Sequence, residues 1–249
     1  MPYSNYINTI DENLKLNPTN WYFKREMHYN SVLEHIDIHK GYDYLKYINN
    51  EFNDIFNNNL NFFINLCNIN DYYGNTIKEN FTNFCICSPS NLRYIYHSLL
   101  IFDHFKKLNI KNIDIIEIGG GYGGLSFFIN NLSYLFNFKI KSYTIFDLPS
   151  VSILQKKYLN LLNIYNINTY NLDENFELNN NSYLISNYAY SEINKSLQKE
   201  YTNKVLNKYI DHGFLVWNFG NFYNFIDNKT LITEEERPLT CSDNLFVYF

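Results

Sequence analysis

Apolar residues recur at two different periods along the 249-residue chain, and the change of period divides it into two parts. The first part has helical spacing, and helices are expected over residues 21–36 and 42–66. Gly41 breaks this pattern, and an asparagine run at 57–59 interrupts it again. Residues 1–18 are polar and predict a frayed leader. We therefore predict a mostly helical N-terminal cap over residues 1–87.

The second part, residues 88–249, alternates short apolar runs with helical segments. Ser88 and Pro89 form a helix start, because serine caps a helix and proline is tolerated at its first position; this helix should reach about Leu108. Strands are expected at 113–118, 139–146, 167–171, 182–186 and 213–217, and helices at 125–136, 152–162 and 192–209. This alternation predicts a parallel α/β sheet with crossover helices.

The last two apolar runs differ from the others, because no helical segment separates them. Residues 230–233 and 244–249 both have strand character. We expect them to form an antiparallel hairpin that closes a mostly parallel, seven-stranded sheet.

A glycine-dense turn follows the first of these strands and opens the next helix. It reads Glu117-Ile-Gly-Gly-Gly-Tyr-Gly-Gly124. Gly119, Gly121 and Gly124 satisfy the dinucleotide pattern G-x-G-x-x-G. Glu117 with Gly119, Gly121 and Gly123 satisfies acidic-x-G-x-G-x-G, a pattern typical of S-adenosylmethionine-dependent methyltransferases. The glycines alone therefore leave two cofactor classes open.

The flanks of the turn favour the methyl donor. A carboxylate at Glu117 would repel a pyrophosphate, but it suits a sulfonium ligand that also carries an ammonium group. Asp147 ends the next strand, where a carboxylate can accept hydrogen bonds from ribose hydroxyls, although NAD sites share this feature. The expected hairpin is typical of methyltransferase sheets.

Residues 113–249 thus resemble the class I (Rossmann-like) methyltransferases. The whole chain more closely resembles the sugar O-methyltransferase family of bacterial and viral surface-glycan clusters. The blocks that carry this are 117–125, Phe146-Asp-Leu-Pro149, Gln155-Lys-Lys-Tyr-Leu159, 184–192, Asp71-Tyr-Tyr-Gly-Asn75 and Ser88-Pro-Ser-Asn-Leu-Arg93. The resemblance implies S-adenosyl-L-methionine as cofactor and a sugar hydroxyl of a surface glycan, or of its precursor, as substrate.

Three kinds of position supply candidate donor-binding residues: the turn, the strand ends that follow it, and the helix before it. Asp173 follows the third strand, where an acidic residue often accepts from the adenine amino group. Arg93 could pair with the donor carboxylate, or it could form a salt bridge at the surface or within the cap. The full predicted set is Glu117, Gly119, Gly120, Gly121, Tyr122, Gly123, Asp147, Leu148, Asp173, Asn187, Tyr188 and Arg93.

Methyl transfer to a hydroxyl needs a group that accepts a proton. Glu192 follows the fourth strand by a short loop and could act as this base, or it could stabilise a helix N-terminus. His212 precedes the fifth strand and is the second candidate, with a turn position as its alternative. The Asp-Leu-Pro step is similar to that of plant-type O-methyltransferases, but these carry a His-Asp base where this chain has Ser191-Glu192.

No metal site is predicted. His35 and His39 are four residues apart, which suits a metal on a helix face, but no third ligand is evident. Some sugar methyltransferases use a divalent ion, so a metal stays open without being indicated. Cys85-Ile-Cys87 is too closely spaced for a usual zinc knuckle, and no Cys-x-x-Cys pairs with it. We expect reduced cysteines in a cytoplasmic protein, which for a viral protein means the host cytoplasm.

The formal net charge of −5 shows no basic excess, so a nucleic-acid partner is not expected. No apolar run reaches the roughly 18 residues of a spanning helix. A homo-oligomer stays open. The alternatives in function are a small-molecule O-methyltransferase acting on a phenol or carboxylate, a NAD-binding oxidoreductase, and a cofactor-binding protein without catalysis.

Overall fold

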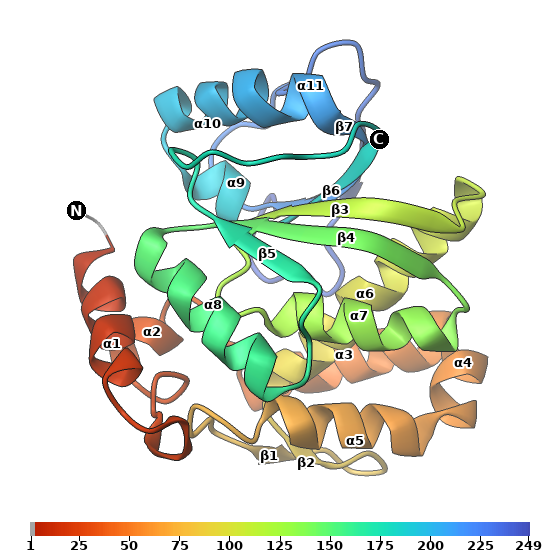
Figure 1. Ribbon diagram of the computed structural model, residues 1–249. Coiled ribbons are helices and arrows are strands. Elements are labelled where there is room, and N and C mark those ends of the chain that lie inside the picture. The colour runs from red at the N-terminus through yellow and green to blue at the C-terminus, as the bar shows by residue number, and fades with distance from the viewer. Residues whose placement is uncertain (1–2) are drawn as a thin grey trace.

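A seven-stranded sheet runs through the computed structural model, which describes residues 3–249 (Figure 1). Its strand order is β5-β4-β3-β6-β7-β9-β8, and β9 alone runs antiparallel to its neighbours β7 and β8. The strands are β3 (Asn112–Ile118), β4 (Lys139–Phe146), β5 (Ile167–Tyr170), β6 (Ser182–Asn187), β7 (Ile210–Trp217), β8 (Ile232–Glu235) and β9 (Leu245–Tyr248). This order, with its antiparallel C-terminal hairpin, is that of the class I methyltransferase fold, so the predicted fold class is confirmed.

Helices cover both faces of the sheet. On one face lie α6 (Pro89–Lys107), α7 (Gly124–Leu135) and α8 (Pro149–Leu161). On the other lie α10 (Lys195–Tyr201), the π-helical turn η2 (Thr202–Leu206) and α11 (Asn207–Tyr209), which follow the short helix α9 (Ala189–Glu192). The single helix predicted over 192–209 is therefore wrong at its start. Ile193 is extended, and Asn194 begins a new helix by accepting a hydrogen bond from the Leu197 amide at 3.0 Å.

Alternate residues of each strand enter two separate apolar clusters, as the pleat requires. Ile115 of β3 and Ile185 of β6 pack into the cluster on the α6, α7 and α8 face. Ile116 of β3 and Leu184 of β6 pack into the cluster on the opposite face. The first cluster continues into the N-terminal cap, where it includes Tyr6 and Phe63. The cap and the sheet therefore share one core.

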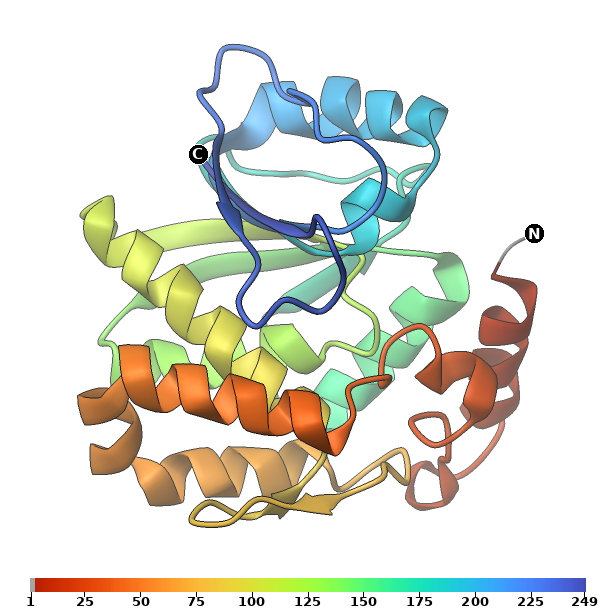
Figure 2. The ribbon, with the colours of Figure 1, turned by 180° about the vertical axis from the view of Figure 1, so that it is seen from behind.

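The cap is helical except for one short hairpin, and it lies against α6 and α7 (Figure 2). Its elements are α1 (Ser4–Leu14), the 3₁₀ turn η1 (Pro18–Asn20), α2 (Met27–Asn30), α3 (Ile38–Glu51), α4 (Asn53–Asn58), α5 (Leu60–Asn70), β1 (Glu79–Asn80) and β2 (Ile86–Cys87). The prediction of a frayed leader is wrong for residues 4–14. Tyr6 and Ile10, one helical turn apart, are both buried, so α1 has an apolar side that packs.

Two further predictions for the cap are wrong. The helix expected over 21–36 is reduced to α2, and Trp21 and Phe23 are both buried although two residues apart, a spacing that no single helix face provides. Gly41 does not end a helix but lies inside α3. A Cβ atom there would come within 2.5 Å of the Phe81 ring, so glycine permits close packing of α3 on the hairpin loop. Within residues 3–249, no helix is long and apolar enough to cross a bilayer.

Candidate active site

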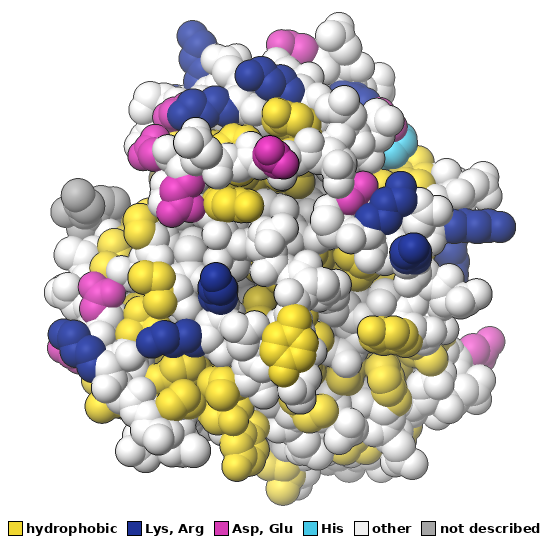
Figure 3. Space-filling model, in the orientation of Figure 1, with side chains coloured by type: hydrophobic (Ala, Val, Ile, Leu, Met, Phe, Trp, Pro, Cys, Tyr) yellow, Lys and Arg dark blue, Asp and Glu magenta, His cyan; other side chains and the backbone are white. Residues whose placement is uncertain are grey.

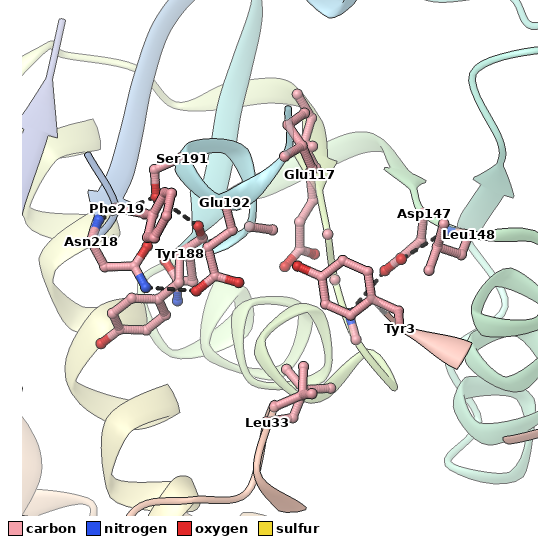
Figure 4. A pocket seen from close by; sticks show the side chains of 18 of the residues that line it. Tyr3, Leu33, Glu117, Asp147, Leu148, Tyr188, Ser191, Glu192, Asn218 and Phe219 are labelled. Carbon is pink, nitrogen blue, oxygen red and sulfur yellow. Dashed lines mark hydrogen bonds between the residues drawn. The ribbon is translucent and has the colours of Figure 1, made fainter. Parts of the chain in front are cut away.

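A cavity of about 1540 Å³ opens at the carboxyl ends of the parallel strands, the edge at which open α/β sheets bind ligands. Figure 4 shows the carboxyl groups of Glu117, Asp147 and Glu192 directed into it from β3, the end of β4 and α9. Tyr3 and Leu33 close it from the side of the cap. Ligand pockets typically measure about 300–1000 Å³, so this one has room for a cofactor and a second molecule.

The glycine turn is held tightly between α9 and the cap. Gly119 has φ +75°, and its amide donates to the Phe146 carbonyl at 2.9 Å. A side chain at Gly119 would collide with Ala189, and a Cβ on Gly121 would lie 2.6 Å from Leu33 Cδ1. Glycine is therefore required at both positions, for conformation and for space. Because these residues are glycines, they place no side chain between the backbone of the turn and the cavity.

Glu117 is a buried acid at the end of β3, with only 2% of its surface exposed. Its Oε2 accepts a hydrogen bond from the Tyr143 hydroxyl at 2.8 Å. The pKa of Glu117 is raised to about 7, chiefly by burial and in smaller part by the nearby Asp147, while the Tyr143 hydrogen bond opposes the shift. A cationic ligand beside this carboxyl would stabilise its ionised form.

Asp147 ends β4 and is braced from three sides. It accepts hydrogen bonds from the Leu148 amide at 2.8 Å, the Gly121 amide at 3.1 Å and Gln155 Nε2 at 2.9 Å. Burial raises the pKa of Asp147 to about 7, although these hydrogen bonds act in the opposite direction. A carboxylate offers about four acceptor positions, so roughly one remains for a ligand hydroxyl.

Gln155 of α8 supports the site in a way that its position in the sequence did not predict. Besides Asp147, its Nε2 donates to the Gly121 carbonyl at 2.7 Å, and its side chain is fully buried. It therefore ties the glycine turn to the end of β4. Its place in the Gln155-Lys-Lys-Tyr-Leu159 block was the available signal, but nothing in that block indicates which way the amide points.

Arg93 of α6 lines the cavity and fastens the cap segment above the turn. Its guanidinium donates to the Leu33 carbonyl at 2.7 Å and lies 5.5 Å from the ring centres of Tyr94 and Tyr188. Among residues 3–249 it makes no ion pair, so the alternative of a surface salt bridge is wrong. Its role toward a donor carboxylate stays a prediction.

The segment after β6 forms the opposite wall. Asn187 and Tyr188 both line the cavity, and Tyr188 has a left-handed backbone with φ +68°. The Tyr188 amide donates to the Val216 carbonyl at 3.0 Å, and its hydroxyl donates to the buried Glu236. Gly120, Leu148 and Asp173 also lie at the cavity, so the structure brings these five predicted positions together.

Three predicted residues do not reach the cavity. Tyr122 points beneath the turn, where its hydroxyl accepts from Asn70 Nδ2 at 3.1 Å. Gly123 serves as the N-cap of α7, with φ +94°. His212 lies near the amino end of β7 and pairs with Asp211 at 3.3 Å, so the structure does not bring it to the cavity, which lies at the other end of that strand.

Glu192 is exposed and lies at the cavity, and a chain of two hydrogen bonds positions its carboxyl group (Figure 4). Asn218 Nδ2 donates to Glu192 Oε1 at 2.6 Å, and the Ser191 hydroxyl donates to Asn218 Oδ1 at 2.6 Å. Asn218 was not among the predicted residues, although it directly follows β7 at the carboxyl edge of the sheet. The arrangement fixes a carboxylate next to the space that faces Glu117.

The similarity of this chain to known proteins is distant. No protein-family model matches the chain, and no curated protein matches it by sequence. Among solved structures, a methyltransferase from Aquifex aeolicus is 13% identical, with a TM-score of 0.42 over 59% of this chain and 87% of that one. Mitomycin 7-O-methyltransferase is 10% identical, with a TM-score of 0.40 over 55% and 48% of the two chains. The chain spans about half the length of the first structures it matches, between 48% and 56%.

Proposed function

We propose that this protein binds S-adenosyl-L-methionine and transfers its methyl group to a sugar hydroxyl of a surface glycan or of a glycan precursor. One observation carries the proposal: Glu117 and Asp147 end adjacent parallel strands on either side of a bare glycine turn and face one cavity. The strand order, in which antiparallel β9 lies between β7 and β8, supports this choice over a NAD-binding oxidoreductase, because the classic dinucleotide-binding sheet has the order 3-2-1-4-5-6.

The residues of the turn and the strand ends suit this cofactor. Glu117 would face its positively charged amino-acid end, and Asp147 would accept from a ribose hydroxyl with its remaining acceptor position. Asp173 lines the cavity after β5 and would contact the adenine, whereas Asn187 ends β6, on the other side of β3, and would contact the donor. When bound, the cofactor supplies a methyl group on a sulfonium centre, which leaves readily in an in-line displacement.

Glu192 is the proposed general base. Asn218 occupies Glu192 Oε1, so Oε2 would take the proton of the acceptor hydroxyl as its oxygen bonds to the methyl carbon. The proton ends on Glu192 and leaves to solvent, which the exposed side chain contacts. A positioned base of this kind contributes roughly 10²–10⁴-fold in rate.

The lining near Glu192 supports a sugar as acceptor. Aromatic side chains form part of this region, and Phe219 is 67% exposed. Amide side chains stand among them and can exchange hydrogen bonds with several hydroxyls. A sugar ring offers both an apolar face for an aromatic ring and a dense set of hydroxyls. The residues concerned are Tyr3, Phe219, Phe222, Tyr223, Asn194, Asn218 and Asn221.

The distribution of charge on the protein does not favour a nucleic acid as the acceptor. Figure 3 shows acidic side chains among the basic ones over much of one face, with a small group of basic side chains at its right-hand edge. The formal net charge of −5 points the same way.

Calorimetric titration with S-adenosylmethionine, S-adenosylhomocysteine and NAD⁺ tests the first half of the proposal. We expect both sulfur cofactors to bind one per chain and NAD⁺ not to bind. If neither S-adenosylmethionine nor S-adenosylhomocysteine binds, the proposal is wrong. Transfer of a labelled methyl group to a panel of sugars, nucleotide sugars, phenols and carboxylates then tests the acceptor. Turnover of phenols alone would replace the sugar with a small-molecule acceptor.

A further inference from the structure

Three cysteine thiols meet in the cap, away from the cavity. Cys67 comes from α5, and Cys85 and Cys87 come from the β1–β2 hairpin. Their sulfur atoms all lie within 4.8 Å of one another. Cys67 and Cys87 are buried and Cys85 is half-buried. No Cys-x-x-Cys motif pairs with Cys85-Ile-Cys87, but Cys67 supplies a third thiol from 18 residues earlier in the chain.

The spacing of these sulfurs suits a shared metal ion. With Zn–S bonds of about 2.3 Å, sulfur ligands in a tetrahedral site lie about 3.8 Å apart. The observed separations of up to 4.8 Å require a contraction of about 1 Å at most. Thiolate donors select Cu⁺ and Zn²⁺ over hard cations such as Mg²⁺ and Ca²⁺. Within residues 3–249 this is the one group of three His, Cys, Asp or Glu side chains with such spacing.

Metal binding by thiols is coupled to loss of their protons. An incoming cation would bond to the three sulfurs as their protons leave to solvent, so charge and atoms balance without any oxidant or reductant.

We propose that Cys67, Cys85 and Cys87 bind one thiophilic d¹⁰ cation, Zn²⁺ or Cu⁺. Cu⁺ is satisfied by three thiolates, whereas Zn²⁺ takes a water as fourth ligand on the side where Cys85 reaches the surface. The ion fastens α5 to the hairpin. In Figure 1 this hairpin lies at the bottom of the molecule, far from α9, and none of its residues lines the cavity. The ion would therefore stabilise structure and take no part in methyl transfer.

The site also holds the start of α6. Cys87 precedes Ser88, whose amide donates to Asp71 Oδ2 at 2.7 Å and whose hydroxyl accepts from the Ser90 amide at 3.3 Å as the helix cap. The same helix carries Arg93 to the cavity. A metal ion at the cluster therefore fixes the base of the helix that anchors the cap.

Metal titration of the reduced, full-length protein tests the proposal. Zn²⁺ and Cu⁺ are each titrated anaerobically in competition with a chromophoric chelator. The wild type should bind one equivalent of at least one of them, and Cys85→Ser should bind at least about tenfold more weakly. Cys241→Ser is the matched control, because Cys241 is exposed and outside the cluster, and its metal binding should equal that of the wild type. Preference for Zn²⁺ or Cu⁺ in this competition identifies the ion.

Two further readouts make the result independent of folding effects. Cys85 is chosen because it is half-buried, and circular dichroism checks that Cys85→Ser keeps its helices. Bound Co²⁺ used as a probe should show thiolate charge-transfer absorption in the wild type and a weaker band in Cys85→Ser. The melting temperature should rise on adding metal in the wild type and Cys241→Ser, but not in Cys85→Ser.

The proposal is overturned if the wild type binds neither ion more tightly than Cys85→Ser does, or if Cys241→Ser loses binding to the same degree. Formation of a disulfide within the cluster under mild oxidation, in a protein that binds no metal when reduced, would also overturn it and assign the cluster to redox chemistry. None of these results depends on the proposed methyl transfer.

Discussion

The two sides of the cavity are built in different ways. The side that holds Glu117 and Asp147 comes from two consecutive strand–turn–helix units, and hydrogen bonds from Gln155 and the backbone brace it internally. The side around Glu192 is assembled from α1, α9 and the segment after β7, and its Phe219 is largely exposed. We call these the donor side and the acceptor side. The donor side is rigid before any ligand arrives, whereas the acceptor side offers adaptable contacts.

The largest effect is expected on the acceptor side. Replacing Glu192 with Gln keeps the hydrogen-bond geometry toward Asn218 but removes the proton acceptor. We expect kcat to fall by roughly 10²–10⁴, while S-adenosylmethionine affinity changes less than about twofold because the donor side is untouched. Single-turnover kinetics and calorimetry measure the two quantities. Unchanged turnover would remove Glu192 as the base.

On the donor side, Gly119→Ala should destabilise the fold. The new methyl group would collide with Ala189, and φ is +75° at this position. Left-handed backbone costs about 1–2 kcal/mol and overpacking about 1–3 kcal/mol, so the free energy of unfolding should fall by about 2–5 kcal/mol. Urea titration measures it.

The control for that change is Gly220→Ala. Gly220 has φ +68°, but no atom lies within 4 Å of the position of its missing Cβ. It should lose only the conformational part, about 1–2 kcal/mol. Equal losses in the two variants would show that the contact between the turn and α9 contributes nothing.

Glu117→Gln tests the charge on the donor side. Glutamine keeps the size of the side chain and can still accept from Tyr143, but it cannot ionise. S-adenosylmethionine should bind about tenfold more weakly or worse, because one charge–charge contact of about 1.4 kcal/mol or more is lost. Calorimetry measures the affinity. Wild-type affinity in this variant would place the cationic part of the cofactor elsewhere.

The pH dependence of binding follows from the same group. The pKa of Glu117 is raised to about 7, so in the ligand-free protein this carboxyl is protonated below neutral pH. The contribution of that bound proton to the stability of the fold is lost as the pH rises through 7. Binding of a cation favours the carboxylate and releases the proton. Affinity should therefore rise by up to about tenfold per pH unit from pH 5.5 to 7 for one proton released. Glu117→Gln should flatten this slope.

The smallest effect is expected for His212→Ala. The imidazole lies near the amino end of β7, half-exposed beside Asp211 and Lys229. Both kcat and cofactor affinity should stay within about twofold of the wild type, because the change lies far from either side of the cavity. A large loss of turnover would contradict the placement of the active site at the carboxyl edge.

The same contrast explains how much could be predicted from the sequence. The strand predicted at 139–146 is β4 with identical bounds, and its carboxyl end correctly indicated Asp147 at the cavity. These features depend on local periodicity and on the rule that parallel strands end together. Asn218 and Gln155 were missed because their roles depend on where their amides point after folding.

In the cap the local signals were misleading for a physical reason. Trp21 and Phe23 insert separately into the shared core, so their spacing reflects tertiary packing instead of a helix period. Cys67 and the hairpin cysteines approach one another only because α5 packs beside β2, and no spacing rule connects them. A regular spacing of apolar residues indicates an element with one buried face. These cap segments are buried on several sides, so their apolar residues have no regular spacing.

The apolar cluster shared by the cap and the sheet has a thermodynamic consequence. It joins Tyr6 of α1 and Phe63 of α5 to Phe214 of β7 and Phe246 of β9 without an interruption at the boundary near residue 87. Removing the cap would expose the apolar side of α6 and α7 to water, which costs about 25 cal/mol for each Å² uncovered. We therefore expect the two parts to unfold together, so that heat or denaturant that loosens the cap also disrupts the glycine turn at the same midpoint.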